Sequence, residues 1–358
     1  MNELSEKYEL IGAYVELTTE CNLRCLHCYN ESGKKNASIT KENLRNICHS
    51  LKQANQDRIT FSGGEPFLHP NLLEYINFCI EEGLYVTIIS NGTKITKEIV
   101  EQLPKERLFF QISLNGENDT IHDMLCGKGS YTQTMKGISL LQEKFQDAIQ
   151  VHCVMNQYNQ QHLKSLLEFL RNKHLFAVSF SELNDTGRTK KNENKITMSH
   201  RKVVQITEEL QNDKHIKQWI KKGMSISFPE TSIGCPFMDE QDIGISPRID
   251  AYGNVYLCQS LEKFVVGNIN QNSLYQIICD NKQVEDAMNE IKKAREKIKE
   301  CDQCVWQFTC GRGCPATSFM KYHSLEKIDG ECAERSLLLL EDLKNNLDYN
   351  MDNYGEMR

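Results

Sequence analysis

Between residues 13 and 183, six short apolar runs alternate with longer segments in which apolar residues recur at helical spacing. The length of these runs and their β-branched residues predict strands at 14–17, 58–61, 85–90, 108–113, 149–155 and 177–180. Such alternation predicts a parallel sheet with right-handed crossovers, either open or curled into a partial barrel. In both architectures, the functional loops follow the carboxyl ends of the strands.

The domain organisation follows from length and composition. At 358 residues, the chain exceeds the size at which one core grows comfortably, so a large and a smaller domain are expected. Residues 184–196 are polar and lack periodicity, which predicts a loop, and one charged helix is expected at 283–300. The predicted divisions are an α/β domain over 1–224, a cysteine-rich domain over 225–343 and a polar tail over 344–358.

Charge and hydropathy disfavour two classes of partner. The chain has 42 basic and 49 acidic residues, a formal net charge of −7. Because this composition shows no strongly basic face, we expect no nucleic-acid partner. No run approaches the ~18 apolar residues of a membrane helix, and the first residues are acidic where a signal peptide is basic. We therefore expect a cytoplasmic protein that does not enter a membrane.

The chain contains 15 cysteines. In a chain of this kind, an odd number argues against a disulfide framework and for metal or redox chemistry. Ten of them form two groups, Cys21, Cys25 and Cys28 near the start, and Cys235, Cys258, Cys301, Cys304, Cys310, Cys314 and Cys332 in the last third. The other five stand singly, mostly among apolar neighbours, and are interpreted as small buried hydrophobic residues: Cys48, Cys79, Cys126, Cys153 and Cys279.

The first cysteine group, Cys21, Cys25 and Cys28, follows the first predicted strand directly. Three thiolates at this spacing can bind three corners of a [4Fe–4S] cubane and leave one iron open to substrate or cofactor. The alternative is a zinc site completed by His27. That site is disfavoured because His27 lies between two of the cysteines, where closing a tetrahedron on one metal would strain the loop.

A second motif, Gly63-Gly64-Glu65-Pro66, follows the second predicted strand. Glycines let a backbone approach closely, and an acidic side chain can pair with an ammonium group. Taken alone, the motif is equally consistent with a turn that merely uses glycine and proline.

With both motifs in place, residues 13 to about 190 resemble the radical S-adenosylmethionine (SAM) superfamily. The resemblance implies a partial (β/α)6 TIM-like barrel with a bridging helix over residues 1–224. The resemblance implies that the open iron chelates the amino and carboxylate groups of SAM. An electron from the cluster then breaks the sulfonium C–S bond and gives a 5′-deoxyadenosyl radical, which abstracts a substrate hydrogen. The resemblance also implies SAM contacts from His27 to adenine, from Gly63, Gly64, Glu65 and Pro66 to the amino group, and from Asn91 and Ser113 near methionine and ribose.

The seven cysteines of the last third resemble the SPASM extension of peptide-modifying radical SAM enzymes, which holds auxiliary iron–sulfur clusters. By analogy with two-cluster ferredoxins, where the cysteine before proline ligates the other cluster, the predicted ligand sets are Cys301, Cys304, Cys310 and Cys332 for one [4Fe–4S] cluster and Cys235, Cys258 and Cys314 for the other. One or two structural zinc sites are the alternative, but seven ligands do not divide evenly into sites of four cysteines.

The second ligand set is thus one cysteine short. One group of candidates for the fourth ligand consists of the nearby carboxylates Asp239, Glu240 and Asp242. Cys279 is another candidate, although a buried helix cysteine is the better interpretation. Otherwise one iron stays open and can bind substrate. With the SAM cluster, the chain is expected to hold three [4Fe–4S] clusters.

These features predict a maturase that modifies a ribosomally made peptide or protein, by a cross-link such as a thioether or C–C bond, or by oxidation. The alternatives are an anaerobic sulfatase-maturating enzyme, a small-molecule radical SAM dehydrogenase and a zinc-binding interaction protein, the last of which leaves Gly63 to Pro66 unexplained. In the sulfatase-maturating family an Asp follows the second SPASM cysteine and acts as base. Here Gln259 follows Cys258, and an amide cannot take up that proton.

The expected partners follow from the same reading. Only about a dozen residues precede the first predicted strand, too few to fold alone as a leader-binding module. A separate leader-binding protein, or the barrel itself, would then recognise a precursor peptide. A flavodoxin- or ferredoxin-type protein is expected to supply the electron.

Overall fold

The computed structural model describes residues 7–33, 36–229, 235–238, 243–340 and 343–344. The chain forms two compact units, one of residues 1–229 with 241–285 and the other of residues 230–240 with 286–358. This division differs from the predicted boundary at residue 225, because strands of the cysteine-rich part continue the sheet of the first unit. No helix in the described residues is long and apolar enough to cross a membrane.

The first unit is built on a ten-stranded sheet with the order β12-β11-β10-β2-β3-β4-β5-β6-β7-β8. Its six central strands are parallel and follow one another in chain order, which confirms the predicted partial barrel. These are β2 (Ala13–Thr18), β3 (Arg58–Gly63), β4 (Tyr85–Ser90), β5 (Leu108–Ser113), β6 (Ile149–Val154) and β7 (Ala177–Ser181). A seventh parallel strand, β8 (Ser225–Ser227), extends this run beside β7.

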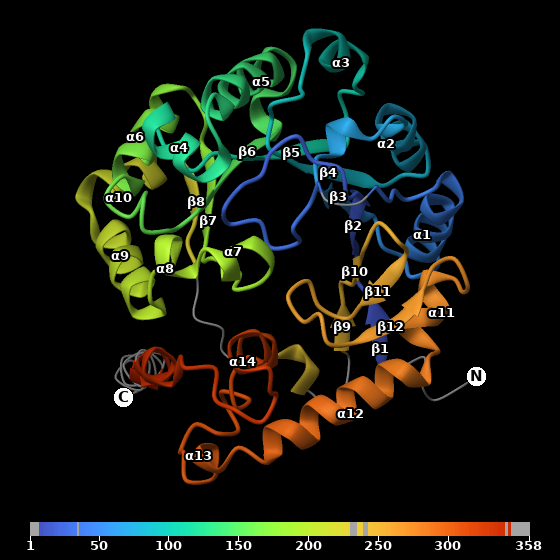
Figure 1. The fold of residues 1–358 in the computed structure, drawn as a ribbon, viewed down its shortest axis with the longest axis vertical. Helices are drawn as coiled ribbons and strands as arrows, with labels where there is room; N and C mark the ends of the chain where they lie inside the picture. Colours follow the sequence, from blue (N-terminus) through green and yellow to red (C-terminus); the bar gives the residue numbers. More distant parts are fainter. Residues whose placement is uncertain (1–6, 34–35, 230–234, 239–242, 341–342, 345–358) are drawn as a thin grey trace, which may run out of the picture. The chain divides into compact units, whose positions relative to one another are not determined.

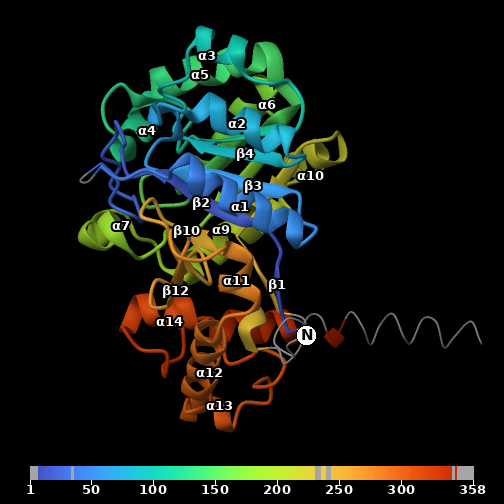
Figure 2. The same ribbon diagram turned by 90° about the vertical axis from the view of Figure 1, so that its right-hand side faces the viewer.

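Helices cover the outer face of the curved sheet, as Figures 1 and 2 show for α1, α2, α5 and α6. Their apolar residues recur at three- and four-residue spacing, so each helix buries one stripe, as Leu163, Leu166, Leu167 and Leu170 do in α6. The helices up to the seventh parallel strand are α1 (Lys41–Gln53), α2 (Leu72–Glu81), α3 (Lys97–Gln102), α4 (Asp119–Cys126), α5 (Ser130–Phe145), α6 (Leu163–Asn172), α7 (Gly187–Lys191), α8 (Glu193–Ile196), α9 (His200–Asn212) and α10 (Lys214–Lys221).

The prediction of a loop at 184–196 is wrong, because this segment contains α7 and α8. Neither helix is long enough to show a helical period in the sequence. The backbone N–H of Arg188 donates to the carbonyl of Cys28 at 2.8 Å, so α7 is held by the first cysteine loop and not by its own apolar pattern.

Residues 243–268 also belong to the sheet of the first unit. β10 (Arg248–Ile249) pairs in parallel with β2, and the hairpin of β11 (Asn254–Tyr256) and β12 (Val265–Asn268) continues antiparallel from it. A separate two-stranded sheet joins β1 (Tyr8–Leu10) to β9 (Ile243–Ile245) in parallel. Helix α11 (Leu274–Cys279) follows, with contacts to α1 and β1.

Helix α12 (Lys282–Glu296) begins in the first unit and continues into the second. The second unit also holds α13 (Lys299–Asp302), α14 (Pro315–Tyr322) and the short 3-10 turn η4 (Pro236–Met238). The charged helix predicted at 283–300 is therefore divided, since α12 ends at Glu296 and α13 begins at Lys299. Most of the late cysteines lie on the short loops and turns of this unit.

Candidate functional site

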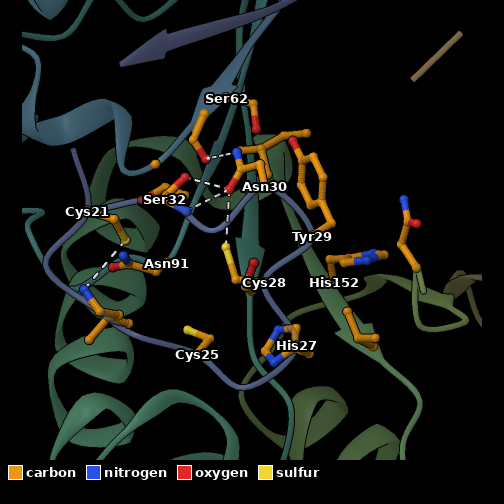
Figure 3. Close-up of a pocket in the computed structure, with 18 of the residues that line it drawn as sticks. Cys21, Cys25, His27, Cys28, Tyr29, Asn30, Ser32, Ser62, Asn91 and His152 are labelled. Carbon is orange, nitrogen blue, oxygen red and sulfur yellow. Dashed lines mark hydrogen bonds between the residues drawn. The ribbon is translucent and has the colours of Figure 1, made fainter. Parts of the chain in front are cut away.

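The three cysteines of the first loop line one cavity of about 370 Å³ at the carboxyl ends of the parallel strands (Figure 3). Ligand pockets in proteins usually span about 300–1,000 Å³, so this cavity has room for a cofactor. Of the predicted SAM contacts, His27, Gly63, Gly64, Asn91 and Ser113 line it. Glu65 and Pro66 are buried and do not line it.

Arg24 holds the cysteine loop in shape. Its Nη1 donates to the carbonyls of Cys21 and Leu23 at 2.7 and 2.8 Å, and its Nη2 donates to the carbonyl of Gly33 at 2.8 Å. The backbone N–H of Gly33 in turn donates to the carbonyl of Thr19 at 2.6 Å, which closes the loop onto the end of β2. The loop is therefore shaped by its own chain, and the sequence analysis gave no signal for Arg24.

The surroundings of the three thiols oppose their ionisation. Burial raises the pKa of Cys21 to about 11 and also raises the pKa of Cys28. The hydrogen bond between Cys25 and Cys126, together with burial, raises the pKa of Cys25 well above its ordinary value. Since metals bind the thiolate, iron binding at this loop must displace protons and grows weaker as pH falls.

Arg188 of α7, which follows the last of the six central strands, reaches this loop with a charged side chain. Its Nε donates to the carbonyl of Cys25 at 2.8 Å and its Nη1 to that of Ser32 at 3.0 Å. Its charge also favours the thiolate forms of Cys25 and Cys28 by lowering the pKa of each. The sequence analysis missed this residue because it assigned the segment to a loop.

The glycines of the second motif serve chain packing. Gly63 has φ of +114°, and a Cβ there would lie 2.6 Å from the carbonyl oxygen of Thr18. A Cβ on Gly64 would overlap the carbonyl of Glu20. The backbone N–H of Gly64 donates to Thr18 at 2.7 Å and that of Glu65 donates to Glu20 at 2.8 Å. The glycines thus bring the second loop against the first, so that both face one cavity.

The Glu65 carboxylate is fully buried and is engaged by the chain itself. Its Oε1 accepts from the backbone N–H of Phe67 at 3.1 Å and from the Ser90 hydroxyl at 2.8 Å. Its Oε2 accepts from the backbone N–H of Asn91 at 2.9 Å. Burial raises its pKa, while these three donors act in the opposite direction. The contact between Glu65 and the amino group of SAM therefore stays a prediction, and what the structure shows is a link to the third loop.

Asn91 begins that third loop. Its Oδ1 accepts from the backbone N–H of Thr93 at 2.9 Å, and its Nδ2 donates to Oδ1 of Asn22 in the cysteine loop at 3.3 Å. Asn22 Nδ2 donates in turn to the Thr93 hydroxyl at 2.8 Å. The first and third loops are therefore joined by two side-chain contacts beside Cys21.

Three histidines line the same cavity, His27, His122 and His152. Burial lowers the pKa of each to about 4, so all three are neutral near pH 7. Nδ1 of His27 and Nε2 of His122 are buried without a hydrogen-bond partner among the described residues. Buried polar atoms that lack partners suit a ligand that carries donors and acceptors, as adenine and ribose do. The sequence analysis singled out only the first of these histidines.

One wall of the cavity comes from the segment after β11. Gln259, next to Cys258, lines the cavity together with Tyr14 and Tyr29. The Tyr29 hydroxyl donates to Oε1 of Glu16 at 3.0 Å, and Arg248 Nη1 lies 3.7 Å from the same oxygen. Gln259, the residue after the second SPASM-type cysteine, therefore belongs to the site of the first unit.

In the second unit, the four predicted ligands of one cluster lie close together. Burial raises the pKa of Cys332, and the neighbouring thiols of Cys310 and Cys304 add to this effect. The pKa of Cys301 is raised by burial and then by Cys332 and Cys310. These four side chains are therefore near enough to interact electrostatically, as ligands of one cluster must be.

The second predicted set is divided, with Cys235 and Cys314 in the second unit and Cys258 in the first. Their joint role stays a prediction. The carboxylates Asp239, Glu240 and Asp242 lie outside the described residues. Cys279 is buried in α11 of the first unit, as expected for a packed helix cysteine.

Among the described residues, no three Cys, His, Asp or Glu side chains converge on one point as ligands of a single metal ion would. A cubane is different, because each of its thiolates binds a different iron and the ligands stand apart. The three thiols around the first cavity, with the unpartnered His27 and His122 nitrogens beside them, fit a cubane and SAM better than a mononuclear zinc site.

Comparison with known families decides the assignment. The family model of the Radical SAM superfamily matches residues 15–170, and that of SPASM, an iron–sulfur cluster-binding domain, matches residues 243–305. The chain belongs to the radical SAM superfamily. The SPASM match begins at β9 and ends in the second unit, so the SPASM region spans both compact units. The two matches support SAM and iron–sulfur clusters as cofactors, while the number of clusters remains a prediction.

Several curated proteins are similar in sequence to this chain. The subtilosin biosynthesis protein AlbA of Bacillus subtilis is 32% identical over 184 residues, which cover 50% of this chain but only 40% of that protein. The mycofactocin maturase MftC of Mycolicibacterium smegmatis is 25% identical over 339 residues, covering 89% of this chain and 81% of its own. The AdoMet-dependent heme synthase of Methanosarcina barkeri is 24% identical over 327 residues, covering 85% and 90%.

Solved radical SAM structures share the fold. The structure of anSMEcpe with bound AdoMet and Cp18Cys peptide has a TM-score of 0.70 at 18% identity, covering 94% of this chain and 99% of that chain. The structure of Streptococcus suis SuiB bound to precursor peptide SuiA has a TM-score of 0.72 at 16% identity, covering 91% and 76%. At these identities the likeness shows a common fold, which confirms the predicted fold class.

Proposed function

We propose that this radical SAM enzyme is a maturase that modifies a side chain of a ribosomally synthesised peptide or protein. The modification is a cross-link, such as a thioether or C–C bond, or an oxidation. Support comes from relatives whose names carry such roles, AlbA in subtilosin biosynthesis and MftC as a mycofactocin maturase. Among proteins with the same fold, SuiB has been seen with a precursor peptide.

The observation that carries the proposal is the composition of one cavity. The three cysteines of the first loop and Gln259 of the SPASM region line the same space. When bound there, the cluster and SAM would supply a 5′-deoxyadenosyl radical able to abstract hydrogen from a substrate. A substrate side chain entering beside Gln259 would meet that chemistry, while the SPASM region contributes to its binding.

The residues in and around the cavity would have distinct roles. Cys21, Cys25 and Cys28 would hold the cluster, and Arg24 and Arg188 would fix the loop that presents them. Asn91 and Ser113 would contact SAM from the third and fourth loops. The neutral His27 can accept or donate a hydrogen bond at adenine without adding charge.

Gln259 weighs against the sulfatase-maturating alternative. It lies in the cavity where a catalytic base would face the substrate, and its amide cannot take up a proton near neutral pH. A reaction that releases a substrate proton at this position would need another acceptor. A heme synthase is among the relatives, so a small-molecule substrate is the alternative that the test must distinguish from a peptide.

The test begins with anaerobically reconstituted protein, SAM and dithionite. Formation of 5′-deoxyadenosine is expected, and Cys21→Ala, Cys25→Ala and Cys28→Ala together should abolish it. Cys304→Ala with Cys310→Ala should retain cleavage, because the SAM-binding loop is intact, but should lose product formation. Equal loss in both variants would mean that the late cysteines only maintain the fold.

The substrate arm uses short peptides encoded beside this chain, with and without a purified candidate leader-binding protein, and a flavodoxin as alternative reductant. A SAM-dependent mass change in the peptide supports the maturase. If only a porphyrin precursor is converted, the small-molecule alternative replaces it. Oxidation of a sulfatase-derived cysteine peptide would show that Gln259 does not prevent sulfatase maturation.

A further inference from the structure

Arg295, in the last turn of α12, is fully buried in the second unit. A guanidinium remains protonated in proteins, so its burial is costly unless hydrogen bonds and a counter-charge compensate. Its three hydrogen bonds all end on neutral backbone carbonyls. Nη1 donates to Leu325 at 3.0 Å and to Lys327 at 2.8 Å, and Nη2 donates to Arg312.

The Nε–H of Arg295 is buried and has no hydrogen-bond partner among the described residues. Among the described residues, the carboxylate with the largest electrostatic effect on Arg295 is that of Asp329. Asp329 is already engaged, because its Oδ2 accepts from Arg335 at 2.6 Å and from the backbone N–H of Cys314 at 2.6 Å. Among the residues that the structure describes, no carboxylate is therefore left to pair with Arg295 alone, and its Nε–H donor is unused.

The Arg312 carbonyl that accepts from Nη2 lies in the turn between Cys310 and Cys314. The thiols of Cys301, Cys314 and Cys235 also act electrostatically on Arg295. Cys301 belongs to one predicted cluster and the other two belong to the second. A [4Fe–4S] cluster on thiolates is anionic, and it becomes more so by one charge on reduction. An anionic cluster held by these cysteines would supply the missing counter-charge and an acceptor for the free N–H.

We propose that Arg295 is a positioning cation for the auxiliary iron–sulfur clusters, which raises their reduction potential by stabilising the reduced, more negative state. The inference rests on the proposed auxiliary clusters of the SPASM region. In a buried site the cation acts with little screening from water, so its effect on the clusters exceeds that of a surface charge.

The experiment uses the full chain with Cys21→Ala, Cys25→Ala and Cys28→Ala, so that the remaining iron signals come from the late cysteines. In this background we compare Arg295→Gln, which removes the charge, with Arg295→Lys, which keeps it. Lys297→Gln is the matched control, because it removes one positive charge two residues away, from a side chain that is 65% exposed. The readouts are iron content and the midpoint potentials from dithionite titration followed by electron paramagnetic resonance.

Arg295→Gln should lower at least one midpoint potential by about 59 mV, a tenfold shift in the ratio of reduced to oxidised cluster. Arg295→Lys and Lys297→Gln should stay close to the parent protein. Iron retained with unchanged potentials in Arg295→Gln would overturn the inference. Equal loss of iron from Arg295→Gln and Arg295→Lys would do the same, because Arg295 would then only hold its three carbonyls. Absence of iron from the parent background would instead refute the auxiliary clusters themselves.

Discussion

The carboxylate of Glu65 holds the first residue of the next loop, Asn91, by a hydrogen bond of 2.9 Å from its backbone N–H. Glu65 is outside the cavity and Asn91 lines it. The acidic residue of the second motif therefore acts on the site through a neighbouring loop.

Glu65→Gln leaves one carbonyl oxygen and places an NH2 group where the structure has a second acceptor. The buried N–H of Asn91 then faces a donor, which costs about 1–3 kcal/mol of folding free energy. We expect weaker SAM binding in equilibrium dialysis as the third loop shifts. Asp123→Asn is the control, since Asp123 holds Gly129 and Tyr131 in a comparable way elsewhere. Lower stability with unchanged SAM affinity would show that Glu65 does not influence SAM binding through the third loop.

Cys25 and Cys126 are hydrogen-bonded neighbours with different expected roles. Cys25→Ala should remove roughly four irons per chain, the content of one cubane. Cys126→Ala should keep them, because Cys126 packs with Leu125 and Ile196 in an apolar cluster. Iron analysis of the two variants after anaerobic reconstitution decides this. Iron loss from Cys126→Ala but not from Cys25→Ala would mean that Cys126, and not Cys25, is the cluster ligand.

Arg188→Ala removes the hydrogen bonds to the carbonyls of Cys25 and Ser32 and a charge that favours thiolates. We expect slower and less complete incorporation of the SAM-binding cluster, measured as lower absorbance in the iron–sulfur bands of the visible spectrum. Arg188→Lys should recover part of it, since the charge remains. Lys195→Ala, at an exposed position of α8, is the control. Full incorporation in Arg188→Ala would show that Arg24 alone orders the loop.

His152 links stability to pH. Burial lowers its pKa to about 4, while both ring nitrogens contact hydroxyls, Ser179 at 2.9 Å and Ser181 at 3.0 Å. Between pH 6.5 and about 4 the unfolded chain binds a proton that the folded chain does not, so stability falls as pH falls, by up to about 1.4 kcal/mol per pH unit. Denaturant titrations at several pH values should show a smaller slope in His152→Gln. Parallel curves for the two proteins would contradict this.

Total iron tests the number of clusters. Ten cysteines serving three cubanes predict roughly twelve irons and twelve sulfides per chain, four per cluster. The variant with Cys21→Ala, Cys25→Ala and Cys28→Ala should retain about eight irons per chain. A parent value near four, with zinc making up the difference, would contradict the auxiliary clusters.

The sequence predicts the barrel strands well, and β4 and β5 agree with the expected ranges 85–90 and 108–113. Buried parallel strands are nearly continuous apolar runs, so their ends are sharp in the sequence. Cys21 and Gly64 line the same cavity because each follows one of two adjacent parallel strands, at whose carboxyl ends the sequence places the functional loops.

Other features depend on contacts that no local pattern reports. β10 has only two residues, and its pairing with β2 joins distant parts of the chain. The position of Glu65 also escapes prediction, because a carboxylate near an ammonium site can equally be satisfied by the chain's own N–H groups. His122 of α4 and His152 of β6 line the same cavity, although they belong to different elements and no local pattern links them.

The pairing of Val15 with Ile249 also constrains how the protein is made. A ribosome that has completed the six barrel strands has not yet synthesised the strand that covers the outer edge of β2. That edge stays available for pairing with other chains until β10 emerges, and an unpaired edge invites aggregation. Nascent chains stopped before residue 248 should therefore need chaperones far more than the finished protein does.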